Sequence, residues 1–185
     1  MATVFIAGSI KIKHLDSRFV DRIRNVISEG LNVAVGDADG ADTSIQKELC
    51  KLDARHVVVY CSGKAPRNNV GVWEVVAVAT DAVEGTRSFF AAKDRQMAKD
   101  ADFGLMMWDA ASAGTLSNVI ELTKRGKKSV VFVNKLKEFI TVKSPSDLQS
   151  LVAVMSSGAF TKADQKIGLN RKLRELSEVQ LGLPL

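Results

Sequence analysis

The segment VGDADGADTSIQKEL, residues 35–49, has the highest density of acidic side chains in the chain. Just before a predicted helix it contains three aspartates and two glycines: Gly36, Asp37, Asp39, Gly40 and Asp42. Three carboxylates repel a phosphate group, so this turn is not the main cradle for an anion. The glycines allow close approach of backbone amides, and Asp37 or Asp39 can accept hydrogen bonds from ribose hydroxyls. We therefore predict that the turn contacts the sugar of a nucleotide-like ligand.

A calcium-binding loop is the alternative for an acidic turn, but the spacing does not fit one. Asp37, Asp39 and Glu48 match positions one, three and twelve of an EF-hand loop. Ala41 occupies position five, however, and Asp42 stands where that loop requires glycine. The two histidines and two cysteines are scattered and do not assemble into a metal-ligand set. We predict no metal site.

The segment WDAASAGT, residues 108–115, is the best candidate for a phosphate site. Gly114 permits close backbone approach, and Ser112 and Thr115 add hydroxyl groups beside the exposed N–H groups at the start of a helix. An ordinary helix N-cap with a permissive glycine is the alternative. Trp108, at the end of the preceding strand, is a candidate for stacking on a bound base; packing in the core is the alternative.

Common cofactor and nucleophile motifs do not occur. No segment completes a GxGxxG or P-loop pattern, so neither nicotinamide nor ATP binding is supported, and we predict no cofactor. The chain also has no GxSxG motif and no cysteine paired with an obvious base.

Short apolar runs alternate with amphipathic segments, as is typical of βα units around a parallel sheet. Strands are predicted at residues 3–9, 31–36, 56–62, 102–109 and 128–134. Residues 72–80 fit a strand or an extended crossing, and residues 139–144 fit an edge strand. Helices are predicted from about residue 16 to Gly30, at residues 84–101 with Phe89, Phe90 and Met97 facing inward, and from Leu116 onward after a loop at residues 110–115. We predict a three-layer, Rossmann-like α/β fold with a mainly parallel central sheet of five or six strands. Ligands of such sheets bind beyond the carboxyl ends of the strands.

Bulk properties are those of an ordinary globular protein. The chain has 185 residues, of which 46% are hydrophobic and 25% charged, and its net charge of +5 is mild for a dedicated nucleic-acid binder. The two cysteines lack CxxC spacing, which favours a reducing compartment. No apolar run reaches the roughly 18 residues of a membrane-spanning helix, and the first segment reads as a strand rather than a signal peptide. We expect a cytoplasmic protein without a membrane partner.

The α/β alternation weakens after Asn134. Residues 145–157 are predicted to form a helix with Pro145 in its first turn, and residues 161–180 a polar helix interrupted at Gly168. We assign this tail to capping or oligomerisation rather than to chemistry.

Four segments follow one another in the order found in the SLOG superfamily: VFIAGS, GDADGAD, AKDRQMAKDAD and SAGTLSNVIELTKRGKKSVVFV. The chain is similar above all to the YspA-type branch, with its GxxGAD, RNxxM and S-x-GT elements. The superfamily is Rossmann-like and includes the cytokinin-activating phosphoribohydrolases (the LOG proteins) and the DNA-processing family. The likeness implies a nucleotide-binding domain at residues 1–134, with residues 135–185 as a helical extension packed on it.

The resemblance also implies one nucleotide-type pocket, lined by Gly8, Ser9, residues 36–42, Arg95 and residues 112–115. Arg95 would face the phosphate or base of the ligand; the alternative is a surface arginine paired with Asp94 or Asp100. The phosphoribohydrolases and the related deoxyribosyltransferases carry a glutamate three residues after the last threonine of this pattern. Asn118 stands there in this chain. An amide cannot act as nucleophile or general base, but it can hydrogen-bond a sugar or base.

Three functions follow from these observations. The first is binding or sensing of a small phosphorylated ligand derived from a nucleotide or nucleoside, possible without a catalytic carboxylate. The second is hydrolysis of an N-glycosidic bond, with Asp39 or Asp109 replacing the missing glutamate. The third is nucleic-acid binding, which the sequence does not favour because the chain has no basic face studded with aromatic residues. The family likeness also implies a homodimer.

Overall fold

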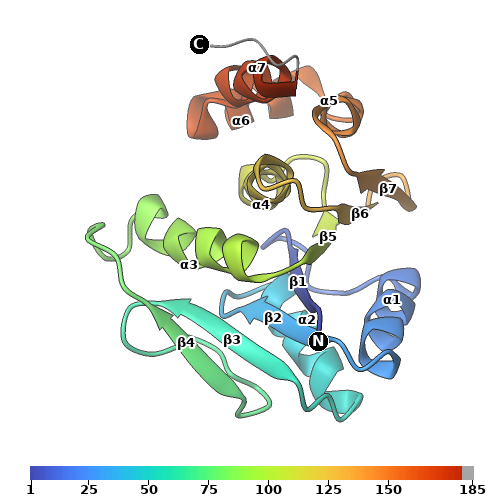
Figure 1. The fold of residues 1–185 in the computed structure, drawn as a ribbon, viewed down its shortest axis with the longest axis vertical. Coiled ribbons are helices and arrows are strands. Elements are labelled where there is room, and N and C mark those ends of the chain that lie inside the picture. The colour runs from blue at the N-terminus through green and yellow to red at the C-terminus, as the bar shows by residue number, and fades with distance from the viewer. Residues whose placement is uncertain (181–185) are drawn as a thin grey trace.

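A seven-stranded β-sheet forms the centre of the computed structural model, which describes residues 1–180 (Figure 1). The strands lie in the order β4-β3-β2-β1-β5-β6-β7, and every neighbouring pair is parallel except β6 and β7. Their bounds are Thr3–Gly8 (β1), Asn32–Gly36 (β2), Val57–Ser62 (β3), Glu74–Val78 (β4), Phe103–Trp108 (β5), Ser129–Val133 (β6) and Glu138–Val142 (β7). The predicted α/β class with a mainly parallel sheet is confirmed, with seven strands rather than five or six.

Helices cover both faces of the sheet and produce three layers (Figure 1). Phe19 and Ile23 of α1 and Ile45 and Leu49 of α2 belong to the apolar cluster on one face. Helices α3, α4 and the C-terminal helices contribute to the cluster on the other face. The bounds are Ser17–Ser28 (α1), Ala41–Lys51 (α2), Arg87–Asp100 (α3), Ala113–Lys124 (α4), Pro145–Val152 (α5), Ser157–Ile167 (α6) and Leu169–Gln180 (α7).

The central strands read as continuous apolar runs because both of their faces are buried. Val4 to Ala7 of β1 and Gly104 to Trp108 of β5 are all buried. Such runs are typical of parallel strands that lie between two helical layers. Strands β1 and β5 are paired, with Ile6 opposite Leu105, and therefore place the segments that follow them side by side.

The two outermost strands account for the higher strand number. β4 pairs with β3, to which it is connected by residues 63–73 without a helix, and most of its residues are exposed or half-buried. β7 returns antiparallel beside β6 after a short turn in which Lys137 has φ of 59°. Edge strands have less buried surface: β4 has no fully buried residue although four of its five residues are apolar, and β7 has one.

The C-terminal helices share the core of the rest of the chain. Ser144 and Asp147 form a reciprocal capping box at the start of α5. Gly168 adopts the left-handed conformation, with φ of 63°, and separates α6 from α7. Leu148 and Leu169 are fully buried, in the same apolar cluster as the side chains of α4.

Candidate functional site

A cleft of about 850 Å³ lies at the carboxyl ends of β1, β2 and β5, bordered by α3, α4, α6 and α7. Both segments that the sequence singled out reach this cleft. Of the predicted residues, eight line it: Gly8, Asp42, Arg95, Asp109, Ser112, Gly114, Thr115 and Asn118. Six others do not line it within residues 1–180: Ser9, Gly36, Asp37, Asp39, Gly40 and Trp108. The position agrees with where open parallel sheets bind ligands.

The first turn of α4 forms one end of the cleft. The helix begins at Ala113, three residues earlier than predicted, so the SAGT segment is a helix start rather than a loop. Ser112 is the N-cap residue, but its side chain makes no capping hydrogen bond. The N–H groups of Ala113, Gly114 and Thr115 have no intrahelical acceptor at this position, and all three residues line the cleft. This turn can donate hydrogen bonds to an anion.

Asp109 and Ser9 hold that turn in place. Oδ1 of Asp109 accepts hydrogen bonds from the N–H groups of Ala111 (3.0 Å) and Ser112 (2.6 Å) and from the hydroxyl of Ser9 (3.1 Å). The Ser9 hydroxyl also lies 3.2 Å from that of Thr115. Ser9 is fully buried, so it joins the segments after β1 and β5 rather than presenting its side chain to a ligand.

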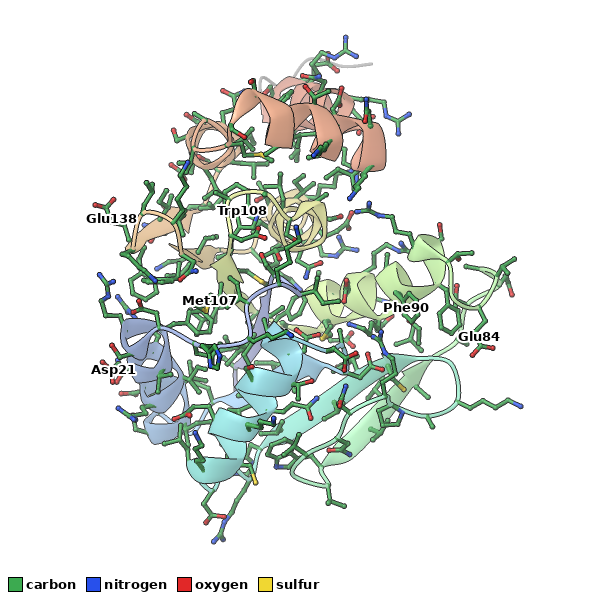
Figure 2. The ribbon with its side chains drawn as sticks, turned by 180° about the vertical axis from the view of Figure 1, so that it is seen from behind. Asp21, Glu84, Phe90, Met107, Trp108 and Glu138 are labelled. Atoms are coloured by element: carbon green, nitrogen blue, oxygen red, sulfur yellow. The ribbon has the colours of Figure 1, made fainter. Side chains whose placement is uncertain are left out.

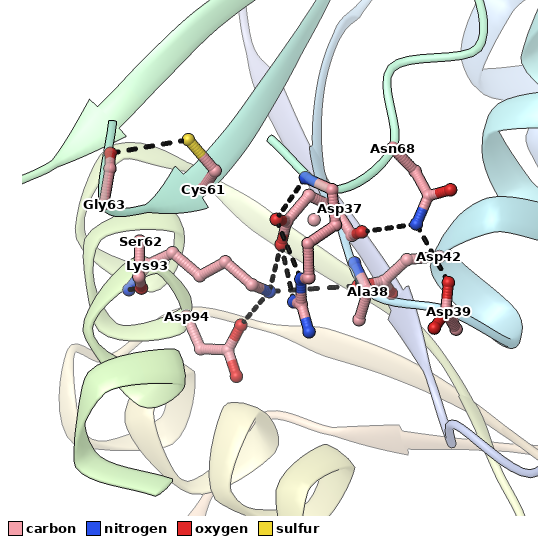
Figure 3. A network of polar contacts seen from close by, with 12 residues as sticks. Asp37, Ala38, Asp39, Asp42, Cys61, Ser62, Gly63, Asn68, Lys93 and Asp94 are labelled. Carbon is pink, nitrogen blue, oxygen red and sulfur yellow. Dashed lines mark hydrogen bonds and ion pairs between the residues drawn. The ribbon is translucent and has the colours of Figure 1, made fainter. Parts of the chain in front are cut away.

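The acidic turn contributes to a compact network of charges (Figure 3). Arg67 donates to both carboxylate oxygens of Asp37, through Nε at 3.1 Å and Nη2 at 2.8 Å. Nζ of Lys93 lies 2.8 Å from Asp94, 3.8 Å from Asp42 and 3.9 Å from Asp37. Asp37 was predicted to contact a sugar; in the structure it is buried and its carboxylate is occupied by these two cations.

Burial and pairing compete in setting the pKa values of this network. Burial alone would lower the pKa of Lys93, but the carboxylates of Asp94, Asp42 and Asp37 outweigh it and raise the pKa above its ordinary value. Burial alone would likewise raise the pKa of Asp37, but hydrogen bonds from Arg67 and the charge of Lys93 lower it. For Asp42 burial dominates, and it raises the pKa to about 6 against the attraction of Lys93.

Gly36 and Gly40 serve the packing of the turn. A Cβ on Gly36 would collide with the carboxylate of Asp42 and with Nζ of Lys93, so glycine is needed where this ion pair crosses β2. Gly40 has φ of 80°, and a Cβ there would overlap the carbonyl group of Ile10. The close neighbours of both glycines are parts of the protein itself, and neither glycine lines the cleft within residues 1–180, so a contact of their amides with a ligand stays a prediction.

Asp39 lies outside the cleft, on the exposed side of the turn. Its carboxylate accepts a hydrogen bond of 3.1 Å from Asn68, whose amide also donates to the carbonyl of Asp37 at 2.9 Å. Asp39 therefore ties the turn to the loop between β3 and β4.

Trp108 is buried, with 1% of its surface exposed. Figure 2 shows Trp108 within the layer between the sheet and the C-terminal helices. Phe90, which the same figure labels, belongs to a different element, α3. The indole Nε1 donates to the carbonyl of Ser112 at 3.0 Å. The prediction that Trp108 stacks on a base is wrong because neither face of its ring is accessible; the alternative of core packing is correct.

Cationic side chains outnumber carboxylates around the cleft. Eight lysines and arginines line it, against four acidic residues. All four acids are engaged: Asp42 and Asp94 by Lys93, Asp109 by backbone amides, and Glu121 by Arg125 at 2.7 Å. Six of the cations form no ion pair within residues 1–180: Lys11, Arg87, Arg95, Lys162, Lys166 and Lys172. The cleft is therefore suited to an anion.

The C-terminal helices supply three of those six cations, although the sequence assigned this region to capping or oligomerisation. Lys162 and Lys166 of α6 and Lys172 of α7 line the cleft. In Figure 1, α6 and α7 lie above α3. Burial lowers the pKa of Lys172, and the nearby charges of Lys124 and Arg87 lower it further, because like charges disfavour another proton.

Sequence reasoning missed Lys93 and Arg67 as well as the C-terminal lysines. A signal existed for Lys93, since it lies four residues after Phe89 and four before Met97, on the face that was predicted to point inward. A charge on an apolar face indicates a buried ion pair. Arg67 comes from a loop without periodicity, so no comparable signal exists.

Among residues 1–180, no three histidine, cysteine, aspartate or glutamate side chains are grouped as metal ligands would be. No helix in this range is both long and apolar enough to cross a membrane.

The fold places the chain among Rossmann-like α/β proteins, and the cleft lies at the carboxyl edge of its sheet. Comparison with models of known families and with curated protein sequences gives no match. Among solved structures, the chain is similar to DNA processing protein A from Helicobacter pylori, which binds single-stranded DNA. The similarity has a TM-score of 0.58 at 16% sequence identity and covers 90% of this chain and 80% of the other. At this identity the match establishes the fold.

Proposed function

We propose that the cleft binds a small ligand derived from a nucleotide or nucleoside and holds it by its phosphate group. The observation that carries this proposal is the imbalance of charge: six cations without an ion-pair partner among residues 1–180 surround a cleft whose four acids are all engaged. Isolated charges of one sign are costly to bring together, and an anionic ligand offsets that cost.

The first turn of α4 is the proposed phosphate position, since its free N–H groups and the helix dipole both favour a negative charge. Asn118 lies one turn further along α4 and is mostly buried at the cleft, where its amide can read a sugar or base. The SLOG resemblance implies a nucleotide at the corresponding edge of the sheet, and the Rossmann-like fold is compatible with that proposal.

The proposal is tested by titrating the protein with thymidine 5′-monophosphate in a calorimeter, with the Gly114→Asp variant as the partner. The position beside Gly114 is open, because the nearest atom to a Cβ would be Oγ of Ser112 at 3.8 Å. A carboxylate there suits the helix N-terminus, so stability should hold, while repulsion should weaken binding by more than about tenfold.

Ser146→Asp is the matched control. It adds the same charge to the first turn of α5, away from the cleft, and should leave binding unchanged. Equal binding by Gly114→Asp and wild type, or no binding by wild type, would contradict the proposal.

Single-stranded nucleic acid is a second candidate ligand, favoured by the structural similarity to a protein that binds single-stranded DNA. The excess of cations around the cleft is compatible with a polynucleotide. Sites of this kind usually stack bases on several aromatic rings. Phe90 is the one aromatic residue that lines the cleft within residues 1–180, and the guanidinium of Arg67 lies 4.5 Å from its ring centre. A steep fall of oligonucleotide affinity with salt would support this candidate.

Hydrolysis of an N-glycosidic bond stays a prediction. Of the two carboxylates suggested for it, Asp39 lies outside the cleft and Asp109 uses Oδ1 to hold the turn before α4. Incubation with nucleoside monophosphates and a search for free base would test it, with Asp109→Asn as the decisive variant. The homodimer and the cytoplasmic location likewise stay predictions.

A further inference from the structure

The cleft extends along α4 well beyond its first turn. Gly114, Asn118 and Glu121 all line it, and the separation of seven positions from Gly114 to Glu121 corresponds to about 10 Å along the helix axis. A single phosphate bound at the first turn therefore occupies only one end.

A second group of cations lies toward the other end. Nζ of Lys124, at the end of α4, lies 3.9 Å from Glu175 of α7, one turn beyond Lys172, so α7 packs beside the C-terminal half of α4. Lys172 and Arg87, at the start of α3, both line this cleft, and the charge of Arg87 helps to lower the pKa of Lys172. Neither Lys172 nor Arg87 has an acidic partner within residues 1–180, and Glu121 is already paired with Arg125.

Helix α6 adds to this group of cations. Lys162 and Lys166 both line the cleft and are four residues apart, or about 6 Å along the axis, on one face of α6. Lys166 and Lys172 flank the turn at Gly168 that joins α6 to α7. The C-terminal helices thus present positive charge that a ligand held only at the first turn of α4 would leave uncompensated.

We infer that the ligand carries at least two phosphate groups separated by a nucleoside, so that the cleft binds two or more consecutive nucleotides. One phosphate lies at the first turn of α4, and another lies between Lys166, Lys172 and Arg87. This inference rests on the proposed function and extends it, because it assigns the C-terminal helices a direct part in binding. A free short oligonucleotide and the end of a longer strand share this chemistry.

The test compares thymidine 5′-monophosphate with 5′-phosphorylated trithymidylate in wild type and in the Lys166→Gln/Lys172→Gln variant. Wild type should bind the trinucleotide at least tenfold more tightly than the mononucleotide. The variant should lose at least tenfold in affinity for the trinucleotide and less than threefold for the mononucleotide. The dependence of log K on log salt should be steeper for the trinucleotide, by about 0.7 for each additional phosphate neutralised.

Arg174→Gln is the matched control: it removes one positive charge from α7 at a residue that does not line the cleft, and both affinities should hold. Equal affinity of wild type for the two ligands, or an equal loss for both in the double variant, would overturn the inference. Mononucleotide binding that is sensitive to Gly114→Asp would in that case still uphold the proposed function. A twelve-nucleotide oligothymidylate distinguishes the two sources of this ligand. If it binds more tightly than the trinucleotide, the ligand is part of a longer strand; if the two bind equally, the ligand is a free short oligonucleotide.

Discussion

The two sides of the cleft carry charge in opposite ways. Around the acidic turn, Lys93 and Arg67 are surrounded by three carboxylates, and Lys93 is 4% exposed. On the side formed by the C-terminal helices, Lys162, Lys166 and Lys172 have no acidic partner within residues 1–180. Charges that are satisfied by the chain stabilise its structure, whereas charges that are left unsatisfied around a cleft are available to a ligand.

The largest expected effect is the loss of the central cation of the paired side. Lys93→Met leaves the buried carboxylates of Asp42 and Asp37 with one cation fewer, and removing one partner of a buried ion pair costs about 3–5 kcal/mol. Urea denaturation should show a loss of this size in the free energy of unfolding. Lys166→Met, on the unpaired side, should change it by less than about 0.5 kcal/mol. Similar small losses in both variants would remove the distinction between the two sides.

The next effect is a pH dependence that arises from Asp42. Because its folded-state pKa is raised from 3.8 to about 6, its contribution to stability is fully present below pH 4 and is lost as the pH rises through 6. The contribution of Asp42 to the free energy of unfolding is roughly 3 kcal/mol at most. The free energy of unfolding should therefore fall more between pH 4.5 and 7 in wild type than in Asp42→Asn. The pKa of Asp37 is lowered, so its change of protonation affects stability only below about pH 4, outside the range of this measurement. Parallel pH profiles of the two proteins would rule out this role of Asp42.

A smaller effect is expected at Asp109, which lies between the two sides. Asp109→Ala removes the acceptor for two backbone amides and the Ser9 hydroxyl, and should cost about 2 kcal/mol. Asp109→Asn retains an Oδ1 acceptor and should cost less than half of that. Both values can be measured by thermal and urea denaturation. If the two variants are equally stable, Asp109 does not hold the first turn of α4.

The smallest effect is expected at Lys172. Because the charges of Lys124 and Arg87 oppose its protonation, Lys172→Gln should leave the free energy of unfolding unchanged or raise it by up to about 0.5 kcal/mol. A loss above 1 kcal/mol in the same denaturation assay would mean that the lysine is satisfied by the protein and is not kept for a ligand.

Periodicity along the chain was sufficient to predict most of the fold. The apolar runs at β1, β2, β3, β5 and β6 and the helix that Gly30 ends were recognisable because burial on both faces, or on one helical face, leaves a repeating pattern. For residues 72–80 the sequence left a strand and an extended crossing open, because a run of valine and alanine without alternation does not show which face is buried. The first turn of α4 was read as a loop because Ser, Gly and Thr are poor helix formers that favour helix starts.

The sequence alone also determined that the segments after β1, β2 and β5 meet, because parallel strands place their carboxyl ends at one edge. Only the tertiary structure decided which side chains remain available there. The carboxylate of Asp37 binds Arg67, which is 30 residues away in the sequence. The indole of Trp108 is buried and donates its N–H to the carbonyl of Ser112, four residues away. The lysines of α6 and α7 reach the cleft because these helices pack onto α4. Ion pairs between residues far apart in the sequence, and the packing of α6 and α7 onto α4, leave no local pattern in the sequence. These contacts decide which charges remain available to a ligand.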